Sequence, residues 1–278
     1  MISAAVVLYR NRQEQIAKVI ESYCPCRQRL LFLIDNDPES GGQFAELARK
    51  EGISYIPSSK NLGYGRAHNI GIERAIALGS VYHIVLNPDV CFSPKVIDSL
   101  ADYAGQHSST VCLQPKILYP DQRLQCLCKL LPTPWDLLLH RFLPNSGVFR
   151  TINERYILMH SGYRHVMNPP SLSGCFLFLR TETLRQQNLR FDERFFMYCE
   201  DVDFVRRLHR CGETEYVPFV QIIHDFEGAS HKSLRMLLVH THSAIVYFNK
   251  YGWFFDRERT QMNRRILEEI QNGLETRV

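Results

Sequence analysis

Short apolar runs along the chain alternate with segments in which apolar residues recur every three or four positions. The runs are rich in β-branched residues and are bounded by polar or turn-forming residues, as buried strands are. The segments between them have the spacing of helices with one apolar face. Four strands are expected in the first third of the chain, at residues 3–9, 30–34, 53–57 and 81–86. This alternation predicts an α/β fold in which helices cover a parallel sheet.

Later elements follow a less regular pattern. A helix is expected after residue 93, because Ser93 could cap its free N–H groups and Pro94 suits the first helical position. A second helix is expected at 201–210, with Gly212 as its C-cap. Strands are expected at 172–180, 214–218 and 220–223. Residues 119–170 lack a clear period and are rich in proline, so they are predicted to form an insertion.

The composition is that of an ordinary soluble globular protein, with 278 residues, 45% of them hydrophobic, and a net charge of +4. It excludes disorder, collagen-like repeats and a coiled coil, and the charge excess is too small to indicate nucleic-acid binding. The nine cysteines have no CxxC spacing and are interpreted as mostly reduced core thiols of a cytoplasmic protein. No signal peptide is recognised, and the apolar stretch 236–248 is shorter than the ~20 residues of a membrane span.

Polar residues end several of the predicted strands. In open α/β sheets ligands bind outside the carboxyl ends of the strands, where Tyr9, Asp35 and Asp89 are expected. Asp35 could accept hydrogen bonds from a nucleobase or a ribose, although the Asp-Asn-Asp-Pro run that begins there also suits a plain turn. In Asn87-Pro88-Asp89 a single carboxylate could hold a hard divalent cation together with phosphate oxygens, or the three residues could form a turn.

Residues 60–71 place glycines before a predicted helix, as a phosphate-binding loop would. The G-x-G-x-x-G pattern of a dinucleotide site fails, because His68 stands at its third glycine. Arg66 and Asn69 at the start of this helix would still suit a diphosphate, and the alternative is a flexible turn.

Three carboxylates, Glu200, Asp201 and Asp203, follow an aromatic run at 195–198. In the first turn of a helix they could simply favour its dipole, but one of them could also take a proton from a hydroxyl. His224 ends an apolar strand and is either structural or a ligand.

Taken together and in this order, these segments resemble family 2 glycosyltransferases of the GT-A fold, most closely the bacterial rhamnosyltransferases that build O antigens and related cell-surface polysaccharides. The matching pieces span residues 1 to about 230, apart from 119–170, and are VVLYRN, IDND, NLGYGRAHNIGI, LNPDV, SGCFLFLR, FDERFFMYCEDVDFVRRLHRCG and IIH. The resemblance implies a mixed, mostly parallel sheet flanked by helices. It also implies a GT-A domain at 1–230 and an aromatic, basic helical tail at 231–278.

The resemblance also implies a role for each matching residue. Positions expected to contact the nucleotide-sugar donor are Tyr9, Asp35, Asn36, Gly63, Arg66, Asn69, Asn87 and Asp89. Asp89 and His224 are implied to bind Mg²⁺ or Mn²⁺, while Asn87 offers only a neutral amide at the first position of the D-x-D-like motif. Asp201 corresponds to the catalytic base, with Glu200 and Asp203 as rivals, and 174–175 would line the acceptor side.

The implied activity is inverting transfer of L-rhamnose from dTDP-β-L-rhamnose to a hydroxyl of a saccharide acceptor that is linked to a lipid. The alternatives are a hexose or N-acetylhexosamine transferase using a UDP sugar, a non-catalytic nucleotide-sugar-binding module, and a nicotinamide-dependent oxidoreductase. The tail would either pack on the catalytic domain or make a peripheral contact with the inner face of the cytoplasmic membrane.

Overall fold

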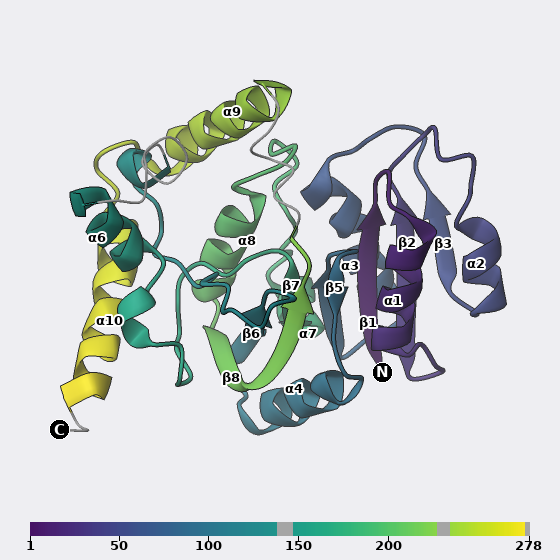
Figure 1. Cartoon of the computed structure of the whole chain (residues 1–278), viewed down its shortest axis with the longest axis horizontal. Coiled ribbons are helices and arrows are strands. Elements are labelled where there is room, and N and C mark those ends of the chain that lie inside the picture. Colours follow the sequence, from purple (N-terminus) through teal and green to yellow (C-terminus); the bar gives the residue numbers. More distant parts are fainter. Residues whose placement is uncertain (138–146, 227–233, 276–278) are drawn as a thin grey trace.

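A single eight-stranded sheet runs through the protein, with strand order β3-β2-β1-β4-β7-β6-β8-β5 (Figure 1). The computed structural model describes residues 1–137, 147–226 and 234–275. The strands are β1 (Ile2–Leu8), β2 (Arg29–Asp35), β3 (Ser54–Pro57), β4 (Tyr82–Leu86), β5 (Val90–Cys91), β6 (Thr110–Leu118), β7 (Phe176–Arg180) and β8 (Glu213–His224). β1 to β4 pair in parallel, as does β6 with β8, whereas β7 runs antiparallel to β4 and β6, and β5 runs antiparallel to β8.

Helices cover both faces of this sheet. They are α1 (Gln13–Tyr23), α2 (Ala45–Lys50), α3 (Tyr64–Ala77), α4 (Lys95–Gln106), α6 (Gly147–Tyr156), α7 (Thr181–Gln186), α8 (Glu200–His209), α9 (Leu234–Tyr251) and α10 (Arg257–Glu275), with a short 3₁₀ helix, η1 (Met159–Ser161). Buried side chains of α1, α2 and α4 form one apolar cluster with the sheet, and those of α3, α7 and α8 form another on the opposite face. The predicted mixed, mostly parallel sheet flanked by helices is confirmed.

Several helix ends differ from the predictions. Ser93 does not cap α4 with its side chain; its backbone carbonyl accepts the Val96 N–H at 2.9 Å, and Pro94 lies just before the first helical residue. Gly212 is not a C-cap, because α8 is followed by Arg210 in a right-handed conformation. A Cβ at Gly212 would overlap the carbonyl oxygen of Ser109, so this glycine allows two backbone segments to approach closely.

Two strand predictions also need correction. Residues 172–175 precede β7 and are not part of it. The two strands expected around residue 219 form one strand, β8, whose register against β6 shifts between Pro115 and Lys116. This register shift allows β8 to continue in the sheet past residue 219, where the sequence pattern predicted a break.

The predicted insertion at 119–170 is built into the core. Its buried residues include Cys128, Leu130, Tyr156 and Tyr163, which pack in the same cluster as α8. Residues 138–146 lie outside the described part. All nine cysteines are free, but only four are buried, so the expectation that most are core thiols is wrong.

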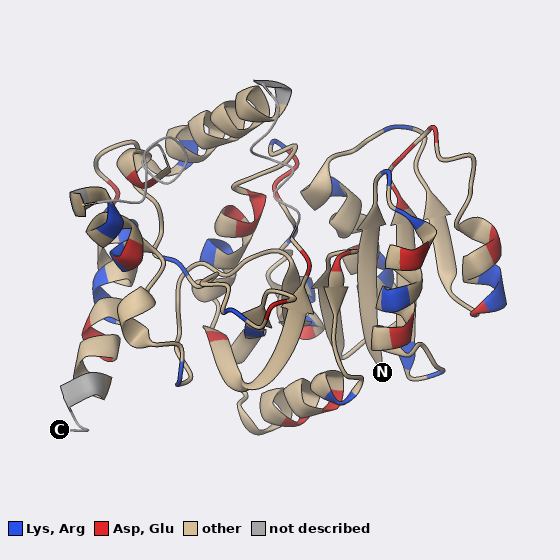
Figure 2. Ribbon diagram, viewed as in Figure 1, with Lys and Arg blue, Asp and Glu red and all other residues tan. Residues whose placement is uncertain are grey.

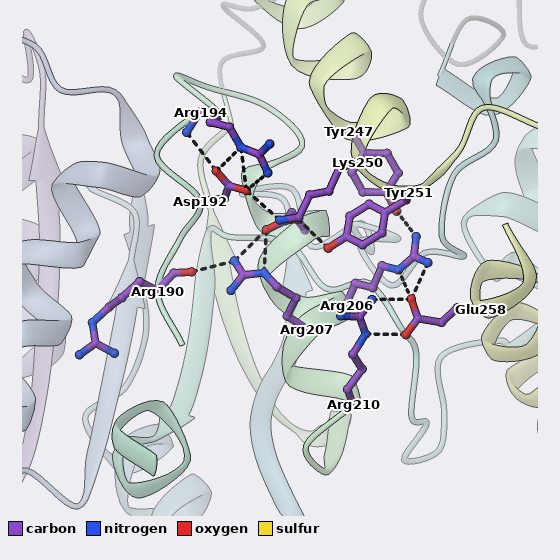
Figure 3. A network of polar contacts seen from close by, with 11 residues as sticks. Arg190, Asp192, Arg194, Arg206, Arg207, Arg210, Tyr247, Lys250, Tyr251 and Glu258 are labelled. Atoms are coloured by element: carbon purple, nitrogen blue, oxygen red, sulfur yellow. Dashed lines mark hydrogen bonds and ion pairs between the residues drawn. The ribbon is translucent and has the colours of Figure 1, made fainter. Parts of the chain in front are cut away.

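The last two helices are fastened to α8 by buried ion pairs (Figure 3). The Arg206 guanidinium, which is 1% exposed, bonds to both carboxylate oxygens of Asp256 at 2.7 and 2.8 Å and to Glu258 at 2.6 Å. Asp203 lies one turn before Arg206 on α8, and its fully buried carboxylate bonds to both Lys250 and Arg207. The orientation of α8 therefore depends on α9 and on the start of α10. No helix in the described ranges is long and apolar enough to cross a membrane.

We predict that Arg206→Ala lowers the free energy of unfolding by roughly 3–5 kcal/mol, because it leaves the Asp256 carboxylate buried without its partner. Urea unfolding at neutral pH measures this. The control is Arg185→Ala, which removes an ion pair of similar length, 2.6 Å, between side chains that are more than half exposed. Its effect on the free energy of unfolding should be far smaller, because water screens an exposed ion pair. Equal effects of the two substitutions would contradict the structural role of the Arg206 network.

Candidate active site

The predicted site residues gather at the carboxyl edge of the first parallel strands. The register pairs Leu8 with Asp35 and Val6 with Leu86, so the residues that follow β1, β2 and β4 emerge side by side. The amino ends of α3 and α8 and the last residue of β8 reach the same edge. The polar residues of distant sequence segments thus face one region, as expected for open α/β sheets.

Asp35 is held rigidly where β2 ends. Its Oδ2 accepts hydrogen bonds from Ser40 Oγ at 2.6 Å and from Tyr55 Oη at 2.5 Å, while Oδ1 accepts the N–H of Asp37 at 3.1 Å. Burial and the bond to Asp35 raise the pKa of Tyr55 to about 12, so this hydroxyl remains a donor. The Asp35 run therefore forms a turn that also places a carboxylate at the edge of the sheet.

Asn36 fastens the glycine loop to the end of β2. Its side chain accepts the Leu62 N–H at 2.8 Å and donates to Asn61 Oδ1 at 3.0 Å and to the Gly63 carbonyl at 3.3 Å. Tyr9 lies at the end of β1, 42% exposed. Its predicted contact with the donor stays a prediction, as does that of Asn36.

The glycine loop is clamped against the segment that precedes α8. Gly63 has φ +81°, and a Cβ there would overlap the Phe196 carbonyl oxygen, which accepts the Tyr64 N–H at 2.9 Å. Asn69 exchanges two hydrogen bonds with the backbone of Phe191, at 2.9 and 2.8 Å. The Asn69 amide thus holds two segments together. Arg66 is half-exposed and pairs with Glu193 at 3.1 Å.

His68 explains why the dinucleotide pattern fails here. Its ring is fully buried against Tyr64, with ring centroids 4.4 Å apart, and neither ring nitrogen has a hydrogen-bond partner among the described residues. Burial lowers the pKa of His68 to about 3, so the ring is neutral. An imidazole occupies the position where a dinucleotide loop requires a glycine for close helix–sheet packing, which disfavours the oxidoreductase alternative.

Tyr64 lies at the centre of the site, and no sequence motif points to it. Its hydroxyl is 3.0 Å from Asn87 Oδ1 and 2.7 Å from the Gly174 carbonyl oxygen. Burial, together with nearby acidic groups such as Cys175 and Glu200, raises its pKa well above the usual range, so the hydroxyl keeps its proton. Tyr64 therefore joins α3 to the Asn87 turn and to the loop before β7.

Asp89 and His224 meet because β5 pairs with β8. Val90 lies opposite His224, and the Asp225 N–H donates to the Asp89 carbonyl at 2.9 Å. The imidazole Nε2 of His224 is 3.3 Å from Asp89 Oδ1. Both atoms are buried, and neither makes a hydrogen bond with the described residues. A nitrogen and an oxygen that face each other in this way suit a divalent cation.

The protein would supply few ligands to a metal ion. No cluster of three or more His, Cys, Asp or Glu side chains with metal-binding geometry occurs in the described ranges. Two protein ligands agree with a cation of the Mg²⁺ type, which fills its other positions with phosphate oxygens and water. The donor set at Asp89 and His224 therefore fits a cation that is shared with a diphosphate.

The three carboxylates of α8 have different surroundings. Asp201 is half-buried, and its Oδ2 accepts the Gly174 N–H at 3.1 Å. Burial and the charge of Asp201 raise the pKa of Glu200 well above its usual range, which favours the neutral acid over the carboxylate. Asp203 is enclosed by Arg207, Lys250 and Tyr251. The geometry leaves Asp201 as the carboxylate suited to accept a proton.

The chain before α8 is strained. Tyr198 and Cys199 have φ values of +71° and +61°, a region that costs non-glycine residues about 1–3 kcal/mol each. In the aromatic run at 195–198, Phe195 is fully buried against Tyr247 and Phe248 of α9. Phe196 is 36% exposed. Two contacts hold the strained turn in place: the packing of Phe195 against α9, and the close approach of Gly63 to the Phe196 carbonyl.

A cavity of about 410 Å³ lies elsewhere, beside the first residues of β2 and β3. Its lining includes Arg29, Phe32 and Ser54, and none of the predicted site residues. It opens at the opposite ends of the strands from those that bind ligands in this type of sheet.

Solved structures of glycosyltransferases share this architecture. S. aureus TarS 1-349 in complex with UDP matches with a TM-score of 0.59 and 16% identity, covering 100% of this chain and 75% of that one. GalNAc-T7 with UDP, GalNAc and Mn²⁺ matches with a TM-score of 0.58 and 12% identity, covering 81% and 43%. The fold is the GT-A fold of nucleotide-sugar-dependent glycosyltransferases.

Sequence comparison gives the family. The model of glycosyl transferase family 2 matches residues 4–149. The N-acetylglucosaminyl-diphospho-decaprenol L-rhamnosyltransferase of Mycobacterium tuberculosis is 32% identical over 243 residues, 77% of this chain and 75% of that protein. Rhamnosyltransferase WbbL of Escherichia coli K12 is 24% identical over 230 residues, 79% and 81% of the two chains. The chain belongs to glycosyl transferase family 2 and is a glycosyltransferase, as the resemblance implied.

We predict that Glu200→Gln makes unfolding less dependent on pH. Because the pKa of Glu200 is raised in the folded state, its contribution to stability is complete below its ordinary value of 4.5 and is lost as the pH rises toward the folded pKa. Between these two pKa values the free energy of unfolding falls by about 1.4 kcal/mol per pH unit. Urea unfolding from pH 5 to 8 should therefore show that the stability of the variant, relative to that of the wild type, increases as the pH rises.

The control for this experiment is Glu182→Gln. A hydrogen bond from Arg185 lowers the pKa of Glu182, so its titration lies below this range and its difference from the wild type should stay constant. A constant difference for Glu200→Gln as well would mean that Glu200 is ionised in the folded protein.

Proposed function

We propose that this glycosyltransferase moves L-rhamnose from dTDP-β-L-rhamnose to a hydroxyl of a lipid-linked saccharide, with inversion at the anomeric carbon. The class of sugar comes from two relatives whose names state rhamnosyl transfer. The observation that carries the proposal is that Asp201 and Asp89, the latter facing His224, both lie near the partly buried Tyr64. These residues come from distant parts of the chain and supply both cation ligands and a proton acceptor.

The donor would lie along the edge from β2 to β4. Asp35, held by Ser40 and Tyr55, is a fixed acceptor for the N–H groups of a base or for ribose hydroxyls. The diphosphate would lie toward Asp89 and His224, with Arg66 able to turn from Glu193 to a phosphate. Asn36, Gly63 and Asn69 would keep this edge in shape through their bonds to the neighbouring backbone.

Asp89 Oδ1 and His224 Nε2 would hold Mg²⁺ or Mn²⁺. When bound, such a cation neutralises charge on the departing diphosphate. Asp201 takes the proton of the attacking hydroxyl, and the Gly174 N–H holds the receiving carboxylate in place. The raised pKa of Glu200 disfavours a second negative charge beside Asp201. Alignment of donor and acceptor would supply a further large part of the rate.

A UDP sugar is the second candidate donor. One solved neighbour is TarS in complex with UDP-GlcNAc, with a TM-score of 0.59 at 14% identity. A hexosyltransferase of Haloferax volcanii, Agl10, is 26% identical over 175 residues. The fold and the proposed proton transfer would be the same for a hexose or N-acetylhexosamine donor.

We propose that the turn between α9 and α10 contacts the membrane that carries the acceptor. Phe254 and Phe255 are 66% and 96% exposed there. The backbone of the turn is nevertheless fixed: Gly252 has φ +101°, and Arg259 donates to the Phe254 carbonyl at 3.0 Å. Figure 2 shows few charged residues on α9, and both basic and acidic ones on α6 and α10. Outward aromatic side chains near basic residues suit the interface of an anionic bilayer.

We predict that Asp201→Asn lowers kcat by about 10²–10⁴-fold while the nucleotide-sugar still binds, because the amide cannot take up a proton. Rhamnose transfer to a lipid-linked N-acetylglucosaminyl diphosphate measures the loss. Glu200→Gln is the matched control, and it should keep kcat within about tenfold because the native side chain is already neutral. Near-normal turnover by Asp201→Asn would rule out Asp201 as the base.

Donor binding is checked on the same proteins by thermal unfolding with dTDP-rhamnose and UDP sugars, with and without Mn²⁺. Metal-dependent stabilisation that is larger for dTDP-rhamnose supports the proposed donor. A larger effect of a UDP sugar would replace the donor, and stabilisation without turnover on any acceptor would indicate a non-catalytic module.

For the membrane contact, we predict that the double substitution of Phe254 and Phe255 by Ser reduces the affinity for phosphatidylglycerol vesicles at least about tenfold, because burial of each ring stabilises binding. Sedimentation with vesicles measures the bound fraction. Phe219→Ser, which removes a ring that is 56% exposed on β8, is the control and should bind as the wild type does. Equal loss in both proteins would contradict the role of the turn.

A further inference from the structure

Gln125 makes close contacts with His224 at both ends of its side-chain amide. Its Nε2 donates to the His224 carbonyl oxygen at 2.7 Å and lies 3.4 Å from the Leu118 carbonyl oxygen. Its Oε1 is 3.0 Å from Nδ1 of the same histidine. The side chain is 5% exposed, and the Gln125 N–H is fixed on the Ile117 carbonyl at 2.9 Å. One glutamine thus holds the backbone and the ring of His224 together.

These contacts determine which way the amide points. Carbonyl oxygens can only accept hydrogen bonds, so the NH₂ group of Gln125 must face His224 O and Leu118 O. The amide oxygen then faces Nδ1, and because this oxygen can only accept, Nδ1 must carry a hydrogen. In a neutral ring the lone pair then lies on Nε2, the nitrogen that faces Asp89 Oδ1 at 3.3 Å.

Two acceptor atoms therefore face each other in a buried place with no hydrogen between them. Such a pair is unfavourable unless a proton or a metal cation joins it, and neither atom has another partner among the described residues. We propose that Gln125 is a positioning residue that fixes His224 in its Nδ1–H tautomer and so makes Nε2 a metal ligand beside Asp89. This inference rests on the metal site in the proposed function.

The first test reads the tautomer without any metal. Two-bond ¹⁵N–¹H spectra of the metal-free full-length protein at neutral pH report which nitrogen of each imidazole is protonated, and a His224→Asn variant identifies the His224 signals. We expect the Nδ1–H form in the wild type and its loss in Gln125→Leu. An Nε2–H form or a doubly protonated ring in the wild type would overturn the inference, as would an unchanged tautomer in Gln125→Leu.

The second test measures Mn²⁺ affinity by electron paramagnetic resonance, with and without dTDP or UDP. Loss of a partner that orients a ligand typically weakens metal binding about 10–100-fold, so this loss is expected for Gln125→Leu. Gln114→Leu is the matched control. Gln114 is equally buried and also bonds to backbone carbonyls, those of Ser173 and Phe176. It should leave the tautomer unchanged and the Mn²⁺ affinity within about twofold, and an equal loss in both variants would overturn the role of Gln125.

The failure of the proposed function gives a different result. A wild-type protein that takes up no Mn²⁺ under any condition, yet shows the Nδ1–H tautomer, would overturn the metal site together with the ligand role of His224. A wild-type protein that binds Mn²⁺ as tightly as Gln125→Leu does would overturn only the role of Gln125. Melting temperatures of all variants establish that the compared proteins are folded.

Discussion

The arrangement of the candidate site depends on the buried charges that connect α8 to α9 and to the start of α10. Buried ion pairs add little net stability, but they impose a single arrangement, because leaving one charge without its partner is costly. Asp203 points into this network toward Lys250 and Arg207. Residues two positions apart on a helix are rotated by about 200°, so Asp201 must point the other way, toward Gly174. The tail helices thereby determine which carboxylate of the acidic cluster reaches the open side.

The sequence predicted the layered architecture well, because buried parallel strands produce continuous apolar runs that can be recognised locally. It did less well where an element ends through a tertiary contact. Ser93 and Gly212 have the right chemistry for caps, yet the helix ends are determined by backbone geometry and by a close approach to Ser109. The continuous strand β8 was also out of reach, because a register shift is a property of two strands and not of one.

The candidate site was predicted to the extent that its residues belong to recognisable segments. The approach of Asp89 to His224 follows from a two-residue strand that pairing with β8 creates, and only the family resemblance indicated it. Tyr64 and Gln125 were missed for different reasons. Tyr64 looks like an ordinary first residue of a helix, whereas Gln125 lies in the stretch without periodicity, where burial of a polar side chain leaves no trace in the sequence. The choice among Glu200, Asp201 and Asp203 required the surroundings of each carboxylate.

The pairing of β5 with β8 also has a consequence for the order in which the protein is made. Asp89 leaves the ribosome in the first third of the chain, whereas Asp201 and His224 come in the last third. The parallel strands β1 to β4 are therefore complete well before Asp201 and His224 are synthesised. A nascent chain, or one cut by a protease before α8, lacks both the proposed proton acceptor and the second proposed metal ligand. The proposed site is complete only after the end of β8 has been synthesised.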